Sequence, residues 1–317
     1  MAPASLLLGV TRGFPAFHLH PDVWLVVATL ALSYWWAITR LGPRIVPAGE
    51  EIVSRGNVIC YSLAVLTLWV FAEWPLHDLA EHYLFSVHML QHLVFTTVSA
   101  PLMLLGLPPW LIRRLLVTPR RVYAIARQVT RPVVALVIFN TFLVLTHWPS
   151  VTNTTTHNEA FHFGVHFVMF GTALILWMPM INRLPELPRL TYPQRVLYLF
   201  LQSFVPTVPG AFLVFSSGVV YKAYVGRPEL LGFSAISDQQ TAGAIMKIGG
   251  GAVLWGILIY TFFKWVGEEQ RRDDAERQAR RAAALTKASE AGSLPETLTW
   301  DDVARELERV PPQRPID

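Results

Sequence analysis

Residues 86–106, SVHMLQHLVFTTVSAPLMLLG, begin with two histidines four residues apart and continue as an apolar run. A helix needs roughly 20 apolar residues to cross about 30 Å of hydrocarbon. Because lipid offers no partners to backbone polar groups, such runs must be helical. The whole run covers residues 84–106, and comparable runs lie near 22–39, 57–74, 132–148, 160–181, 195–219 and 239–264. The sequence therefore predicts an all-α integral membrane protein with a bundle of seven transmembrane helices in the lipid bilayer.

The composition supports a membrane protein. The chain has 317 residues, of which 53% are hydrophobic and only 15% are charged, whereas soluble domains have about 25% charged residues. Its single cysteine, Cys60, excludes an intramolecular disulfide and a cysteine-based metal cluster. The basic residues gather in particular loops, so the net charge of +4 reflects membrane topology and predicts no nucleic-acid partner.

The loops predict the orientation of the chain. Of the 26 lysines and arginines, 22 lie in the loops after the first, third and fifth runs and from Lys264 onward. The positive-inside rule then places the N-terminus outside and the C-terminus in the cytoplasm. We expect a transmembrane domain over residues 1–266 and a short, charged, helical cytoplasmic tail over residues 267–317.

Histidines mark one half of the molecule, because all ten fall in segments predicted to lie outside or at the outer ends of the spans. His88 and His92 share one helix face, and the same spacing recurs at His162 and His166. Met169 lies on the second stripe, one or two turns deeper. His147 ends the fourth run. These six residues are predicted metal ligands for one or two ions at the extracytoplasmic face.

Further polar residues are predicted to support this site. Ionisable groups at membrane depth, such as Lys247, are expected to have a function or an ion partner. His18 and His20 precede the first run and can form a mobile capture arm. The predicted accessory residues are Glu159, Gln91, Asn140, His18, His20, Lys247, Asp238 and Gln240, with Asp238 or Glu73 a possible partner of Lys247.

The ligand types favour copper. Imidazole suits zinc, copper, iron and nickel, and a thioether adds a preference for Cu(I). The lack of cysteine ligands argues against structural zinc. Haem fits least well, because two ligands four residues apart on one helix cannot bind its opposite faces. The residues therefore favour Cu(I) over zinc, and zinc over haem.

Three segments together resemble the CtaG family of cytochrome c oxidase assembly factors. They are HMLQHLVFTTVSAPLMLLGLPPW at 88–110, FHFGVHFVMFGTALILWMPM at 161–180 and SDQQTAGAIMKIGGG at 237–251. The resemblance covers most of residues 20–265 and excludes the tail. Lys247 departs from it, because an aromatic residue is expected there.

The resemblance implies a multi-pass protein of the bacterial plasma membrane, linked to maturation of caa-type oxidases. It implies help with copper delivery to the oxidase metal centres. The implied partners are oxidase subunits and other copper-handling proteins on the outer side; no oligomeric state is predicted.

Three other functions remain open at this stage, of which a haem-binding electron carrier is the least favoured. A membrane-embedded zinc hydrolase needs three protein ligands, a bound water and a general base, for which Glu159 is the candidate. A copper transporter needs ligands that continue to the inner side, where only Met178 and Met180 follow Met169. The main expectation is a copper-binding assembly factor without catalytic activity, and the hydrolase is the alternative enzyme.

Overall fold

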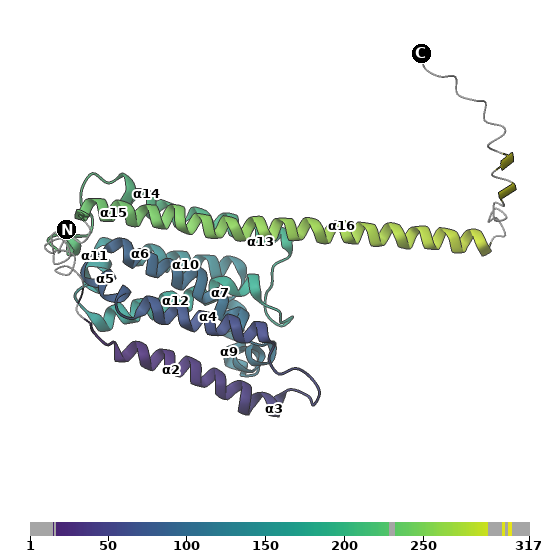
Figure 1. Cartoon of the computed structure of the whole chain (residues 1–317), viewed down its shortest axis with the longest axis horizontal. Helices are drawn as coiled ribbons and strands as arrows, with labels where there is room; N and C mark the ends of the chain where they lie inside the picture. Colours follow the sequence, from purple (N-terminus) through teal and green to yellow (C-terminus); the bar gives the residue numbers. More distant parts are fainter. Residues whose placement is uncertain (1–14, 16, 228–231, 291–299, 302–303, 306–317) are drawn as a thin grey trace, which may run out of the picture. The chain divides into compact units, whose positions relative to one another are not determined.

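A computed structural model describes residues 15, 17–227, 232–290, 300–301 and 304–305. All regular elements in these ranges are helices, which confirms the all-helical prediction (Figure 1). Six helices in the described residues are long and apolar enough to cross a membrane. A seventh span exists only if α9 (Arg120–Val129) and α10 (Pro132–Thr146), which meet at a bend of 79°, count as one.

The fourth predicted run explains why the count of seven is not confirmed. It corresponds to α10, which has 15 residues and starts at a proline. At 1.5 Å per residue, this helix is only about 22 Å long, well short of the hydrocarbon thickness. The preceding α9 carries Arg120, Arg121 and Arg127, so it does not extend α10 as an apolar segment.

The first half of the chain contains α2 (Pro21–Trp36), a π-helix (Ala37–Leu41), α3 (Gly42–Ile45), α4 (Arg55–Ala72), the short α5 (Leu76–His82), α6 (Phe85–Val94), a π-helix (Phe95–Ser99), α7 (Ala100–Gly106), α8 (Pro109–Ile112), a π-helix (Arg113–Val117), α9 and α10. The second half contains α11 (Pro149–Thr155), α12 (Glu159–Ile181), α13 (Tyr192–Phe204), α14 (Thr207–Phe215), a 3₁₀ turn (Lys222–Tyr224), α15 (Ala235–Ala244), a π-helix (Ile245–Gly249) and α16 (Gly250–Glu290).

The core of the helical unit forms around α7 and α12. Gly106 allows α7 to approach α4 closely, because a Cβ at this position would lie 2.5 Å from the Tyr61 amide nitrogen. Trp177 of α12 donates its indole N–H to the Thr96 carbonyl at 2.7 Å, inside the π-helix that follows α6. A π-helix disturbs the i to i−4 hydrogen bonds of an α-helix. The hydrogen bond from Trp177 therefore gives the Thr96 carbonyl a partner, just after the turn that carries His92.

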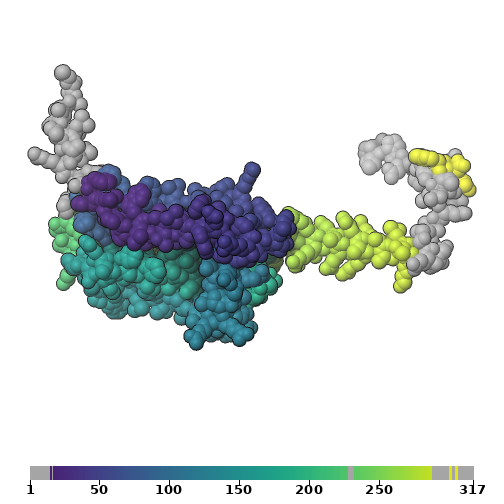
Figure 2. All heavy atoms as spheres, turned by 90° about the horizontal axis from the view of Figure 1, so that it is seen from below, coloured from purple at the N-terminus to yellow at the C-terminus, as the bar shows by residue number. Residues whose placement is uncertain are grey.

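The surface of this unit is apolar where a membrane would contact it. Helix α2, purple in Figure 2, lies at the surface of the unit. Its Leu25 and Leu32 side chains are exposed, at 70% and 62%. Contiguous exposed apolar surface of this kind indicates contact with lipid or protein.

Contacts divide the chain into two compact units, residues 1–262 and 263–317. The domain boundary expected after residue 266 falls inside α16. In the second unit this helix continues to Glu290, with ion pairs such as Arg280 to Glu276 at 3.5 Å. Much of the predicted tail, at 291–299, 302–303 and 306–317, lies outside the described residues.

Candidate metal centre

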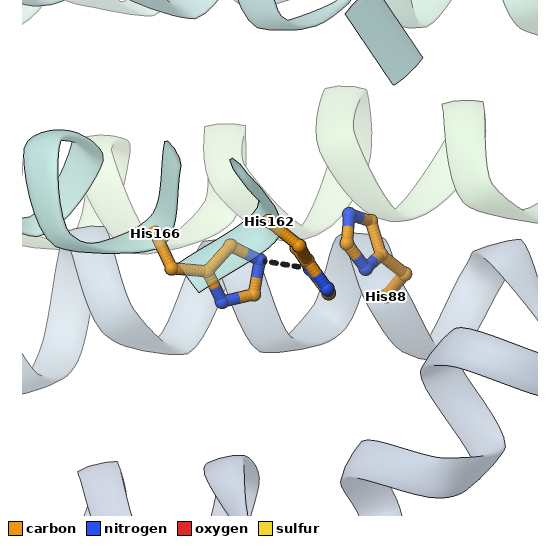
Figure 3. Close-up of side chains that lie close together, drawn as sticks. All are labelled: His88, His162 and His166. Atoms are coloured by element: carbon orange, nitrogen blue, oxygen red, sulfur yellow. Dashed lines mark hydrogen bonds between the residues drawn. The ribbon is translucent and has the colours of Figure 1, made fainter. Parts of the chain in front are cut away.

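Helices α6 and α12 bring the two histidine pairs face to face. One ring nitrogen from each of His88, His162 and His166 lies within 4.8 Å of the other two (Figure 3). His88 and His162 are buried, and His166 is half-buried. Three converging imidazoles form a ligand set that can hold a transition-metal ion. We call these three residues and His92 the histidine cluster.

The closest contacts in the cluster join nitrogen to nitrogen. Nε2 of His166 lies 2.9 Å from Nε2 of His92 and also 2.9 Å from Nε2 of His162. A neutral imidazole nitrogen either donates one proton or accepts one, so Nε2 of His166 can form only one of these hydrogen bonds. Nitrogens bound to one metal at 2.0–2.1 Å lie about 3.3 Å apart. An ion bound by all three nitrogens would therefore replace the conflicting hydrogen bonds, provided that the nitrogens move slightly apart.

Several buried nitrogens have no hydrogen-bond partner among the described residues. Those in and beside the cluster are Nδ1 of His88, Nδ1 of His92 and Nε2 of His147. A buried polar atom without a partner costs free energy. Such atoms rarely persist without a role, and coordination of an ion is one way to satisfy them.

His147 follows the last residue of α10 and faces the cluster. Its Nδ1 lies 2.6 Å from the Leu143 carbonyl oxygen, which can only accept, so Nδ1 carries the proton and Nε2 keeps its lone pair. The ring centroids of His147 and His92 are 6.5 Å apart. With the four cluster histidines, His147 lines a cavity of about 10 Å³, close to the space of one water molecule.

Met169 lies one layer deeper. Its side chain is 2% exposed and lines a larger, mostly apolar cavity of about 70 Å³ together with Met89 and Met246. His92 and His147 line both cavities. The thioether therefore lies below the histidine cluster rather than among its nitrogens.

Glu81 is a candidate site residue that the sequence patterns did not reveal. Its carboxylate in α5 contacts Nδ1 of His162 and lies 3.5 Å from Nε2 of His77. Burial raises the pKa of this carboxyl, but the hydrogen bond from His162 and the favourable charges of His77, His162 and His82 together outweigh burial and lower the pKa to about 2. Because Nδ1 of His162 donates to the carboxylate, its Nε2 points into the cluster with a free lone pair. A carboxylate behind a ligating histidine is a common device in metal sites.

Helix α5 also carries His77, which faces Glu81. Burial lowers the pKa of His77 to about 4, so this ring is neutral at pH 7. Gln91 of α6 is buried and donates its amide to the Phe71 carbonyl at 2.7 Å. The same nitrogen lies 3.4 Å from Nδ1 of His77. Gln91 therefore links α6 to α4 and α5 rather than joining the cluster.

Four predicted accessory residues lie away from the cluster. Glu159 is exposed at the start of α12. Gln240 is exposed and donates to the Ser216 carbonyl at 3.4 Å. Asn140 pairs with Gln202 at 2.8 Å. Lys247 is exposed, with its ammonium 5.8 Å from the centre of the Phe215 ring.

Asp238 holds the start of the helix that carries His88 and His92. Its carboxylate oxygens accept the backbone N–H of Phe85 at 2.6 Å and that of Ser86 at 3.1 Å. The Ser86 hydroxyl donates to the same carboxylate. Asp238 was one possible partner of Lys247, but its carboxylate caps α6. A negative charge here satisfies free N–H groups and complements the helix dipole.

Replacing Asp238 by alanine is expected to lower the free energy of unfolding by about 2–4 kcal/mol, because buried N–H donors lose a charged acceptor. Thermal or chemical unfolding of the purified protein in detergent measures this change. Asp22→Ala is the matched control, since Asp22 lies in the first turn of α2 and is exposed. Equal stability of the two variants would contradict the capping role.

The remaining predicted residues, His18 and His20, lie outside the cluster and contact Asp78. The structure thus unites the two histidine pairs, adds His147 beside them and places Met169 beneath them.

Comparison with known families identifies one match. The model of the family described as cytochrome c oxidase caa3 assembly factor matches residues 32–268, about three quarters of the chain. No curated protein and no solved structure matches the chain.

Proposed function

The chain belongs to the family of cytochrome c oxidase caa3 assembly factors, and we propose that it binds copper, as Cu(I), and helps deliver it to the metal centres of the oxidase. This membership confirms the resemblance noted in the sequence. The observation that carries the copper proposal is the convergence of His88, His162 and His166 within 4.8 Å.

The chemistry of the cluster suits a cargo ion. Neutral imidazoles bind Cu(I) well, and the cluster contains no cysteine that would retain it as tightly as a thiolate. His92 and His147 offer further nitrogens within the same cavity, so an ion can exchange one ligand for another as it leaves. Buried, already oriented imidazoles bind without the cost of ordering them.

The same reasoning supports the proposed location and partners. Every histidine of the cluster lies at the ends of spans that the positive-inside rule places outside the plasma membrane. There the cluster would meet oxidase subunits and other copper-handling proteins. The helical tail would then lie in the cytoplasm.

The zinc hydrolase is the alternative, since three histidines also form catalytic zinc sites with an open position. Such an enzyme needs a carboxylate free to activate water. Glu159, the residue expected in that role, is exposed at the start of α12. Glu81 is engaged by His162. Membership of an assembly-factor family and this carboxylate arrangement both favour a role without catalysis.

Metal analysis of the purified protein tests the proposal. We expect copper at roughly one or two ions per chain and little zinc, as the ligand set favours. Cells that lack the chain should make oxidase deficient in copper, and added copper should partly restore it. Zinc in place of copper, with hydrolysis of a lipid amide or ester, would support the enzyme instead.

A further inference from the structure

Helix α9 lies at the opposite end of α10 from the histidine cluster and runs across it. It ends at Val129, shortly before α10 begins at Pro132, whereas His147 follows the last residue of α10. The two helices meet at 79°. Because α10 belongs to the bundle of apolar helices, a helix nearly perpendicular to it lies close to the plane of a membrane that surrounds this bundle.

The residues of α9 divide into three faces. One face packs on the protein: Ala126 is buried, and the Tyr123 hydroxyl donates to the Glu186 carbonyl at 3.3 Å. A second, apolar face carries Val122 and Ile125, three residues apart, with exposed fractions of 40% and 64%.

The third face of α9 is basic. It carries Arg120 and Arg127, which are seven residues apart and both exposed. At 3.6 residues per turn, these arginines lie about half a turn from the apolar stripe. A helix with apolar and basic faces on opposite sides is typical of one that lies in a membrane interface.

Arginines gather on α9 and at its two ends without balancing acids. Five of them are exposed and are called here the arginine surface: Arg114, Arg120, Arg121, Arg127 and Arg131. No aspartate or glutamate occurs between Glu81 and Glu159. Glu186 reaches this segment from another loop, but it pairs with Arg113 at 2.8 Å. Within the described ranges, no carboxylate forms an ion pair with any of the five.

The chemistry of α9 fits an anionic phospholipid. A guanidinium group donates two parallel hydrogen bonds to phosphate oxygens, and its charge attracts an anionic headgroup. The exposed Val122 and Ile125 would enter the acyl chains beside that headgroup, as in other interfacial helices. A soluble acidic partner would match the arginines but would leave the apolar stripe in water. The positive-inside rule assigns this surface to the cytoplasmic leaflet.

We propose that α9 is an interfacial helix whose arginine surface binds anionic phospholipids of the cytoplasmic leaflet, with Val122 and Ile125 inserted among their acyl chains. This role does not depend on copper, because the surface and the histidine cluster lie at opposite ends of α10. It also gives a reason for the bend before Pro132, which turns α9 from the bundle into the plane of the membrane.

Native mass spectrometry of the full chain in an uncharged detergent tests the proposal. The probes are dioleoyl phosphatidylglycerol, which is anionic, and dioleoyl phosphatidylcholine, which has no net charge. The test variants are Arg120→Gln/Arg121→Gln/Arg127→Gln and Ile125→Ser. The matched control for charge is Arg271→Gln/Arg272→Gln/Arg281→Gln, at exposed positions of α16 where acidic residues accompany the arginines. The matched control for the apolar stripe is Ile59→Ser, an exposed position of α4.

We expect the arginine variant to bind phosphatidylglycerol about 10- to 100-fold more weakly than wild type, because each basic residue near a headgroup contributes to attraction. Its binding of phosphatidylcholine should not change. Ile125→Ser should weaken phosphatidylglycerol binding about three- to tenfold, since less apolar surface is buried. Both controls should stay within about twofold of wild type. A rise in ionic strength should weaken binding to the wild type more than to the arginine variant.

Three outcomes would overturn the proposal. Phosphatidylglycerol affinity within about twofold of wild type in the arginine variant would mean that these residues do not bind the headgroup. Equal losses in the α16 control would indicate a general effect of net charge. A loss in the arginine variant with none in Ile125→Ser would mean that α9 does not insert among acyl chains, and an acidic protein segment would then be the better partner.

Discussion

Replacing His88, His162 or His166 by alanine is expected to lower the affinity for Cu(I) by more than about 100-fold, exceeding the usual loss when only a partner of a ligand is removed. Each supplies one of three converging nitrogens. His166 should show the largest effect, because its Nε2 lies 2.9 Å from both His92 and His162.

Competition with a Cu(I) chelator of known affinity measures this loss. His157→Ala controls for the removal of an imidazole, and circular dichroism checks that the helices are retained. Affinities within about threefold of wild type for all three variants would mean that the cluster is not the copper site. The copper proposal would then lose the observation on which it depends.

Replacing Glu81 by glutamine is expected to weaken Cu(I) binding by about 10–100-fold, the usual effect of removing the partner that orients a ligating histidine. The carboxylate accepts the proton on Nδ1 of His162 and thereby presents Nε2 to the cluster. A neutral amide can still accept this bond, but it no longer stabilises the positive charge on the imidazole–metal unit. The fold should be preserved, because the side-chain volume is unchanged.

Glu159→Gln is the matched control, since Glu159 is an exposed carboxylate in the first turn of the helix that carries His162. Its copper affinity should stay within about twofold of wild type. Equal losses in the two variants would indicate a general electrostatic effect rather than an orienting contact. No loss in Glu81→Gln would show that His162 is held by packing alone.

Local periodicity was enough to predict which helices carry the histidine pairs. The i,i+4 spacing of His88 with His92, and of His162 with His166, assigns each pair to one helix face whatever the rest of the fold does. The structure brings these faces together. Glu159 lies three residues before His162, yet its side chain is exposed whereas His162 is buried, because periodicity does not say which positions a neighbouring segment covers.

The contacts of Glu81 and Asp238 depend on packing between distant segments. Glu81 lies 81 positions before His162, and Asp238 is 153 positions from the backbone N–H of Phe85 that it caps. Similarly, α10 is short because the chain bends between α9 and Pro132. The apolar composition of this segment does not reveal that bend.

The sequence by itself determined that the chain is helical, that its apolar runs suit a membrane, and that histidine pairs occupy one face of two of those runs. These features depend on residues within a few turns of one another, so composition and spacing carry them. Only the tertiary structure decided which carboxylate orients His162, that His147 joins the cluster from a third element, and that Asp78 holds His18 and His20. Those choices follow from the side-by-side packing of helices, which fixes distances that spacing along the chain does not contain.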